Sequence, residues 1–384
     1  TNGDTYYYAD EVKKELLKEF FLELTEDVFN ECLDYLEENN DVVRVEKRIY
    51  LKSYYEKEIN IAMNLKKIDS KAPKMFYNID EKLKELEEKL KINYNETQEK
   101  AIKGALNNNI TIISGGPGTG KTTIINAIVK LYIEKEKLGS ADIMETIALL
   151  APTGRAAKKM NSSTGIPAYT IHRYLKWYKD SNEFVYNEFN KTHHKLIIVD
   201  EVSMIDVDLF NALLNGINSN IKLILVGDTF QLPSVGPGLV LNDLIESDYF
   251  NYIPLNQIYR QSDNSYIPFL AKEIKNNDLS EEFLTKKDDY NFVKVDSCNI
   301  KGAATQITNY SLSKGLDERN VQVLAPMYKG EAGIDALNVI LQNIYNPSKR
   351  NKEEVIYGDY IYREDDKVLQ LVNDLDNNVF NGDI

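Results

Sequence analysis

Several features that would define a protein class are scarce in this chain. Its 384 residues contain only two cysteines, Cys32 and Cys298, which lie far apart and match no metal-binding spacing. This usage suits a reducing compartment, and we expect neither thiol to be functional. There is no run of about 18 apolar residues and no cleavable signal sequence at Thr1, so nothing points to a membrane or to export. We therefore expect a cytoplasmic protein without membrane contacts.

Positive charge is also in short supply. The chain has 46 Lys and Arg residues against 60 Asp and Glu residues, which gives a formal net charge of −14. Because phosphate binding depends on clustered Lys and Arg, this balance argues against a broad nucleic-acid surface but not against a local basic or aromatic groove. The apolar content of 43% and the charged content of 28% are typical of a soluble globular chain. Since it starts at Thr1 and ends just after a turn-like NGD, we expect it to be a piece of a longer chain.

The segment GGPGTGKTT at residues 115–123 is the strongest motif. Apolar runs precede and follow it, which indicates a strand, a glycine loop and a helix, the context of a P-loop. Backbone N–H groups of such a loop surround phosphate oxygens, and the helix adds the positive end of its dipole. Lys121 would reach the β and γ phosphates, and Thr122 would bind Mg²⁺. The predicted nucleotide-binding residues of this loop are Gly115, Gly116, Pro117, Gly118, Thr119, Gly120, Lys121, Thr122 and Thr123.

Two further apolar runs end in polar residues suited to nucleotide chemistry. The run LIIV at 196–199 leads into Asp200 and Glu201, a Walker B arrangement in which the first carboxylate holds Mg²⁺ and the second orients the attacking water. The run at 221–226 leads to Gly-Asp and then to Gln231, which is placed to sense the γ phosphate. A plain turn after the strand is the alternative for this Gly-Asp pair.

Two more segments are ambiguous. Residues 95–101 open a helix ahead of the P-loop strand, where Gln98 either contacts an adenine edge or caps the helix. Residues 147–152 form a buried strand that leads into APTGRAA, so Thr153 and Arg155 lie where ligands bind in parallel sheets. Thr153 can equally be a helix cap.

The N-terminal residues predict a small separate module. Helices are expected at about 8–24 and from Thr25 to the stop at Asn39 and Asn40, followed by a hairpin at 42–51 and a helix at 54–68. This order is winged-helix-like. Because its helices are rich in Glu and Asp, a structural or docking role is favoured over DNA reading.

Aromatic runs about a polar turn predict a hairpin within residues 176–195, which contain Trp177, the only tryptophan. A small satellite core under a loop is the alternative. Further along, residues 262–289 read as a helical, polar connector. Residues 321–327 are expected to start a second sheet, with a helix at 335–342.

The motifs taken together resemble the RecD-like superfamily 1 DNA helicases, and most of all their long-form bacterial members. The resemblance covers nearly all of the chain from Asn95. It is carried by GGPGTGKTT, APTGRAA, TIHRYL, DEVSM, GDTFQLPSVGPG, LNQIYRQ and VLAPMYKGEAGIDALN, with DKVLQLVND and VFNGD near the end. It implies ATP-driven movement along single-stranded DNA with 5′ to 3′ polarity, and unwinding of duplex in DNA recombination or repair.

The resemblance also assigns roles to residues. It implies that Gln98 contacts adenine, that Lys121, Glu201, Gln231 and Arg260 act in hydrolysis, and that Thr122 and Asp200 hold Mg²⁺. Arg260 would be an arginine finger on the γ phosphate, although an ordinary surface charge is the alternative. The residues implied to line the DNA track are Thr153, Arg155, His172 and Trp177. In this family the hairpin at 176–195 acts as the pin that splits the duplex.

The expected fold class is α/β, a P-loop NTPase with a RecA-like parallel sheet covered by helices on both faces. The expected parts are a winged-helix-like module (1–70), a helical linker (71–91), the first RecA-like lobe (92–254), a connector with the arginine finger (255–290) and the start of a second, incomplete lobe (291–384). Later motifs of the superfamily are not found after Leu324, so we expect this chain alone to be weak or inactive.

The expected cofactors are ATP and Mg²⁺, and the expected partners are single-stranded DNA and junctions of single and double strands, bound by a monomer. Two other functions stay open. One is a nucleotide-gated module that binds DNA or protein with negligible turnover. The other is the motor of a conjugative relaxase-helicase, which three histidines without a metal-binding cluster disfavour.

Overall fold

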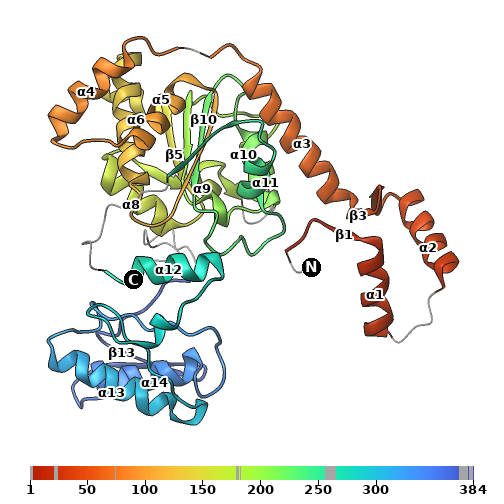
Figure 1. Cartoon of the computed structure of the whole chain (residues 1–384). Coiled ribbons are helices and arrows are strands. Elements are labelled where there is room, and N and C mark those ends of the chain that lie inside the picture. The colour runs from red at the N-terminus through yellow and green to blue at the C-terminus, as the bar shows by residue number, and fades with distance from the viewer. Residues whose placement is uncertain are drawn as a thin grey trace. The chain divides into compact units, whose positions relative to one another are not determined.

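The computed structural model describes residues 3–20, 25–73, 75–178, 181, 183–255, 265–371, 379 and 384. The chain divides into two compact units, Thr1–Gln261 and Ser262–Ile384 (Figure 1). Within the described residues, no helix has both the length and the apolar character needed to cross a membrane.

A six-stranded parallel sheet is the centre of the first unit. Its strands, in spatial order, are β11 (Asn251–Leu255), β4 (Ile110–Gly115), β10 (Lys222–Gly227), β9 (Leu196–Val199), β5 (Ile147–Ala151) and β6 (Ala168–Thr170). Every neighbouring pair is parallel. The four inner strands are largely apolar and are buried almost without interruption, as expected for strands covered on both faces. The predicted α/β fold class is confirmed.

Helices cover both faces of this sheet, and each face has its own apolar core (Figure 1). Successive strand residues face opposite ways, so Ile113 joins one core and Ile112 the other. The first core is built with α4 (Ile79–Leu90), α5 (Glu96–Asn107), α6 (Lys121–Glu136) and α8 (Gly154–Thr164). The second is built with α3 (Lys52–Asp69), α9 (Ile171–Tyr174), α10 (Val207–Gly216) and α11 (Val240–Glu246). A short helix, α7 (Ser140–Thr146), leads into β5.

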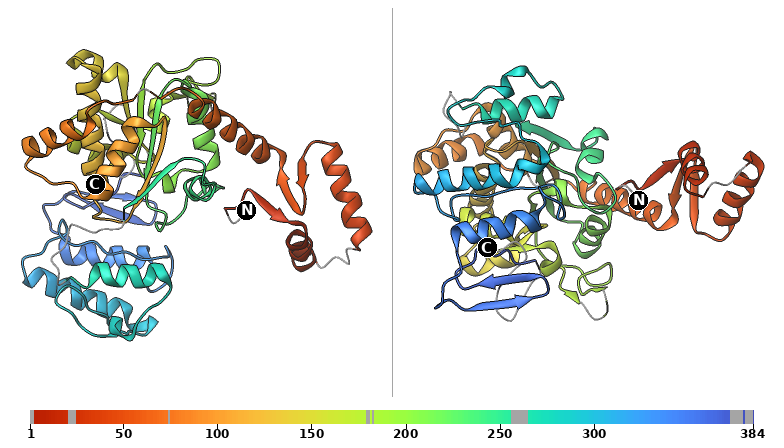
Figure 2. Two further views of the ribbon diagram at one scale, coloured as in Figure 1. Left: turned by 45° about the horizontal axis from the view of Figure 1, so that its top comes forward. Right: turned by 90° about the horizontal axis from the view of Figure 1, so that it is seen from below.

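The N-terminal residues form a three-stranded antiparallel sheet with two helices. The elements are β1 (Tyr6–Tyr8), α1 (Ala9–Phe20), α2 (Glu26–Glu38), β2 (Val42–Val45) and β3 (Arg48–Leu51). Thr25, predicted to open the second helix, caps α2 by accepting a hydrogen bond from the Val28 N–H, and α2 ends at Asn39 as predicted. The strand β1 was not predicted. It pairs with β3 on the side opposite to β2 (Figure 2).

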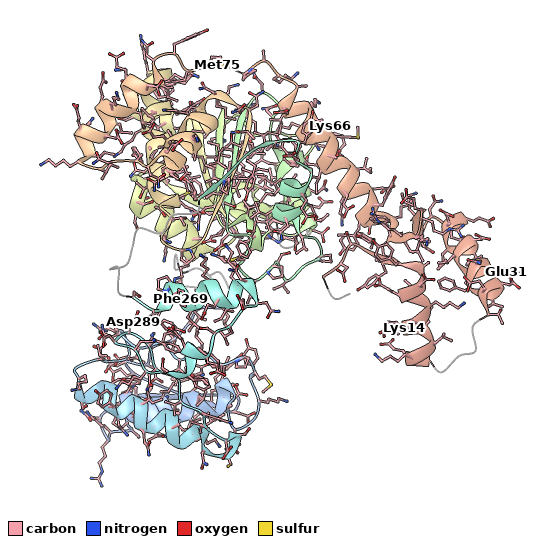
Figure 3. The ribbon with its side chains drawn as sticks, viewed as in Figure 1. Lys14, Glu31, Lys66, Met75, Phe269 and Asp289 are labelled. Carbon is pink, nitrogen blue, oxygen red and sulfur yellow. The ribbon has the colours of Figure 1, made fainter. Side chains whose placement is uncertain are left out.

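Helix α3 fixes this N-terminal part to the sheet domain. Its apolar residues Ile61, Leu65 and Ile68 are buried in the second core. Its polar residues bond to α10: the Asn60 amide donates to the Asn211 and Asn215 side-chain oxygens at 2.7 and 2.8 Å. Lys66, labelled in Figure 3, lies in the last turn of α3.

The described residues of the second unit combine helices and a two-stranded ribbon with long irregular segments. It contains α12 (Ile267–Asn276), α13 (Ile300–Ser313), α14 (Ile334–Tyr345) and the antiparallel ribbon of β12 (Glu354–Tyr357) and β13 (Tyr360–Arg363). Asp289 accepts hydrogen bonds from the Tyr266 and Ile267 N–H groups and so caps the start of α12 (Figure 3).

One predicted strand of this unit is wrong. Residues 321–327, although apolar, form no strand, because none of the described strands pairs with them. A strand is stable only when a partner satisfies its backbone groups. The helix predicted at 335–342 is confirmed as α14.

Candidate functional site: the carboxyl edge of the parallel sheet

The predicted functional segments come together at one edge of the sheet. Because all six strands are parallel, the loops after β4, β9, β10, β5 and β6 leave from the same edge. This edge is where ligands bind in open parallel sheets. The five loops hold the P-loop, the Walker B pair, the 228–231 segment, APTGRAA and TIHRYL. Motifs that are far apart in the sequence thus lie along one edge of the sheet.

The P-loop has the backbone conformation that its glycines predict. Gly118 and Gly120 have φ values of 81° and 89°, which favour glycine. At Gly120 space also matters, because an added Cβ would lie 2.4 Å from the Gln98 side-chain nitrogen. Helix α6 starts directly after it, at Lys121. A 16-residue helix thus points its N-terminal N–H groups into the loop, as phosphate binding requires.

The Lys121 side chain folds back over the start of this loop. Its Nζ donates to the Gly115 carbonyl at 2.5 Å and to the Gly116 carbonyl at 3.1 Å. The Thr119 hydroxyl donates to the Gly116 carbonyl at 2.9 Å. The ammonium group therefore lies against the phosphate cradle rather than in solvent.

Gln98 is a helix cap in this structure. It forms a capping box with Asn95, and its side-chain nitrogen donates to the Thr119 carbonyl at 3.2 Å. The side chain is 6% exposed. Gln98 therefore ties the start of α5 to the P-loop, and an adenine contact through the same amide stays a prediction.

The Walker B pair follows β9 in an unusual backbone conformation. Glu201 has a φ of 54°, in the left-handed region that a non-glycine residue rarely adopts. The turn is held by Asp200, whose Oδ1 accepts from the Glu201 N–H at 2.9 Å. The Glu201 Oε2 is buried and has no hydrogen-bond partner among the described residues. Strain and an unsatisfied buried carboxylate in one residue are typical of functional sites.

Burial raises the pKa of the Asp200 carboxyl to about 6, and the charge of Glu201 adds to this effect. The Glu201 N–H hydrogen bond and the charges of Lys121 and Lys159 act in the opposite direction. Lys121 is therefore close enough to Asp200 for their charges to interact. A buried carboxylate beside a second acid is stabilised by a cation, and oxygen ligands are those that Mg²⁺ prefers. The buried position of Asp200 after β9 suits a ligand of such an ion, and the participation of Thr122 stays a prediction.

We predict that Asp200→Asn stabilises the protein at alkaline pH. The pKa of Asp200 in the folded state is raised above its value of 3.8 in model compounds, so ionisation above pH 6 opposes folding. Removing that charge should increase the free energy of unfolding by on the order of 2 to 3 kcal/mol at pH 8. The gain should shrink as pH falls from about 6 toward 3.8, where Asp200 is protonated in both states. Urea unfolding at several pH values measures this, and a gain independent of pH would contradict it.

The segment after β10 contains Gln231, for which a role was predicted, and Asp228, for which none was. Gln231 is exposed. Asp228 is 3% exposed, and its Oδ1 accepts from the Phe230 N–H at 3.1 Å. An added Cβ at Gly116 would lie 4.0 Å from the Asp228 Oδ2, so this carboxylate borders the P-loop. The sequence pattern gave Asp228 no role beyond a turn.

The candidate DNA-binding residues lie in two neighbouring loops of the same edge. Ala151 at the end of β5 lies opposite Thr170 at the end of β6. Thr153 caps α8 by accepting from the Ala156 N–H, and Arg155 is exposed in the first turn of that helix. His172 follows β6 in α9. Adjacent loops therefore present these three residues.

The predicted hairpin in residues 176–195 is present, although 179, 180 and 182 lie outside the described residues. The strands β7 (Trp177–Tyr178) and β8 (Glu183–Phe184) are antiparallel, with Trp177 opposite Phe184. The two rings are 4.5 Å apart, and the His172 ring lies 6.1 Å from Trp177 and 5.8 Å from Phe184. His172 is exposed, but the groups packed around its ring partly desolvate it and so lower its pKa, which favours the neutral form. His172 and Trp177 thus belong to one aromatic cluster at the base of the hairpin.

One predicted catalytic residue cannot be placed. Arg260, with most of LNQIYRQ, lies outside the described residues, and so does most of VFNGD.

Two family models match the chain at separate places. One, described as an AAA domain, matches residues 98–237, which span Gln98, the P-loop and the Walker B pair. The other, described as the SH3 domain of ATP-dependent RecD-like DNA helicases, matches residues 337–384. Sequence reasoning assigned that interval to the second lobe and did not predict this match.

Curated relatives match parts of the chain. The chain is 34% identical over 273 residues to the ATP-dependent RecD2 DNA helicase of Deinococcus radiodurans, covering 71% of this chain and 35% of that protein. It is 38% identical over 168 residues to the RecBCD enzyme subunit RecD of Mycolicibacterium smegmatis, covering 39% of this chain and 30% of that one. The chain thus spans about a third of the length of these relatives. Among solved structures, a Pif1 helicase from Candida albicans aligns with 20% identity and a TM-score of 0.39, over 57% of this chain and 55% of that one.

Proposed function

Because the chain belongs to the RecD-like helicases, we propose that it supplies the ATP-hydrolysing part of a DNA helicase. The observation that supports this most strongly is the convergence of the P-loop, the Walker B pair and the segment at 228–231 on one sheet edge. In this proposal ATP hydrolysis drives movement along single-stranded DNA. The work would take place in the cytoplasm, during DNA recombination or repair.

Each predicted catalytic or binding residue has a definite task in the proposed reaction. The P-loop N–H groups and Lys121 bind the phosphates, and Glu201 accepts a proton from the attacking water. Gln231 senses the γ phosphate, and Arg260 stabilises charge on it. Mg²⁺, held by Thr122 and Asp200, would neutralise charge that develops on the phosphates. Gln98 holds the P-loop at the adenine side.

The DNA track is proposed to run along the adjacent loops. Thr153 and the helix start at α8 offer N–H groups to a phosphate, and Arg155 offers a charge. The His172–Trp177–Phe184 cluster offers aromatic faces for bases or for a strand junction. This local arrangement is compatible with a net charge of −14, since it needs few basic residues.

Strand displacement by the full-length protein tests the proposal. The substrates are one duplex with a 5′ single-stranded tail, the same duplex with a 3′ tail, and the blunt duplex. We expect ATPase stimulated by single-stranded DNA and displacement of the 5′-tailed duplex only. Displacement from the 3′ tail would contradict the polarity. Nucleotide binding without turnover would instead indicate a nucleotide-gated binding module.

The hairpin is examined in the same assay. A variant with a Gly-Ser turn in place of residues 177–186 should lose displacement but keep DNA-stimulated ATPase, because the hairpin lies outside the nucleotide site. Loss of both activities would indicate that the hairpin is a satellite core and not a pin.

A further inference from the structure

A second buried polar group without a partner lies in the same turn as the Walker B glutamate. The Ser203 hydroxyl oxygen is buried, and no described residue forms a hydrogen bond with it. The Glu201 Oε2, two residues earlier, is also buried without a hydrogen-bond partner among the described residues. Burying such groups without a partner costs free energy, so they are rare in folded proteins. Two of them within three consecutive residues therefore need an explanation.

An ordinary structural role does not provide one. Two other serines of this unit show the usual local solution: Ser163 donates to the Met160 carbonyl at 2.9 Å, and Ser247 donates to the Leu244 carbonyl at 2.7 Å. Ser203 lies in a 3₁₀ turn, Val202–Met204, where such carbonyls are near. Its hydroxyl nevertheless bonds to none of them.

The backbone fixes the position of Ser203 tightly. The Met204 N–H donates to the Glu201 carbonyl at 3.1 Å and closes the turn. An added Cβ at Gly227 would lie 3.3 Å from the Ser203 nitrogen, so the turn packs against the end of β10. Ser203 is therefore held between the Walker B glutamate and the strand end that leads to Asp228. This rigid turn therefore carries both unpartnered oxygens, the Ser203 Oγ and the Glu201 Oε2.

We propose that Ser203 is a positioning residue for Glu201, an inference that rests on the proposed ATPase function. A bridging water accepts a hydrogen bond from the Ser203 hydroxyl and donates one to the Glu201 carboxylate. This pair of hydrogen bonds selects the carboxylate orientation in which Glu201 accepts a proton from the attacking water. Ser203 keeps its own proton throughout, and no covalent bond to it forms or breaks.

The first test is Ser203→Ala in the full-length protein. We expect kcat for ATP hydrolysis to fall about tenfold or more, the scale of a lost supporting hydrogen bond in an active site. The KM for ATP and the dependence on Mg²⁺ concentration should not change, because the hydroxyl touches neither. The melting temperature should not fall, because the hydroxyl has no protein partner to lose. Ser203→Thr keeps the hydroxyl and should restore most of the turnover.

A double-mutant cycle shows whether Ser203 acts through Glu201. In a Glu201→Gln background, adding Ser203→Ala should cause no further loss, since the group that it positions is already gone. The matched control is Tyr345→Phe, which removes another buried hydroxyl without a partner, in the other compact unit. It should leave ATPase unchanged.

The outcomes separate the inference from the function on which it rests. If the parent protein neither binds a fluorescent ATP analogue nor hydrolyses ATP, the proposed function is wrong. If the parent hydrolyses ATP, the inference is overturned by any of three results: Ser203→Ala with the parent's kcat, a rise in KM that accounts for the whole loss, or additive losses in the cycle. Failure of Ser203→Thr to recover turnover while the protein stays folded would also overturn it.

Discussion

Replacing Lys121 by alanine in the full-length protein should abolish ATP turnover and leave the fold intact. The Lys121 ammonium lies against the Gly115 and Gly116 carbonyls, at the point where the loop would hold phosphate oxygens. Without it, charge that develops on the transferred phosphate loses a stabilising cation, a loss of at least about 10²- to 10³-fold in rate. The fold should survive because Lys121 is only partly buried and contributes nothing to either apolar core. Steady-state ATPase and circular dichroism measure the two effects.

Lys89→Ala is the matched control, since it removes the same charge from an exposed position on α4. It should have the parent's turnover. A Lys121→Ala protein that hydrolyses ATP at near the parent rate would show that the P-loop assignment is wrong.

Glu201→Gln should separate nucleotide binding from hydrolysis. The change keeps the shape of the side chain but removes its ability to accept a proton, which is worth about 10²- to 10⁴-fold in rate for a general base. Binding of ATP and Mg²⁺ should persist, because in the proposed site those contacts come from the P-loop, Thr122 and Asp200. Single-turnover hydrolysis and titration with a fluorescent nucleotide measure the two quantities.

Glu88→Gln on the exposed face of α4 makes the same chemical change away from the site and should have no effect. Equal losses of binding and hydrolysis in Glu201→Gln would mean that the glutamate holds the site together rather than acting as a base.

Features encoded over short distances were predictable from the sequence. The strand at Leu196–Val199 was predicted at its observed limits, because an uninterrupted apolar run before Asp-Glu has few alternatives. The cap at Thr25 follows from the local competition of its side chain for backbone N–H groups. The P-loop likewise depends on glycines. The positive φ values of Gly118 and Gly120 could be expected from the local motif alone. These predictions needed no knowledge of the tertiary structure.

Features that depend on distant partners were not predictable. The strand β11 contains Pro254, which argues against a strand, but it is tolerated because β11 is an edge strand paired only with β4. The opposite error was made at residues 321–327, where a strand was predicted but is not formed. An apolar run without a pairing strand stays irregular. The missing partners of Ser203 and Glu201 could be recognised only once the turn around them was known.

The order of strands in the sheet has a consequence for synthesis on the ribosome. The strand β4 lies between β11 and β10, and its Thr111 hydroxyl accepts a bond from Asn251, 140 residues further along the chain. At translation rates of about 5 to 20 residues per second, β4 therefore waits roughly 7 to 28 seconds for that neighbour to emerge. Both edges of this largely apolar strand are unpaired until β10 emerges, and the edge that pairs with β11 stays unpaired for the rest of this time. We therefore expect the nascent protein to depend on chaperones that bind short apolar segments until residue 255 has left the ribosome.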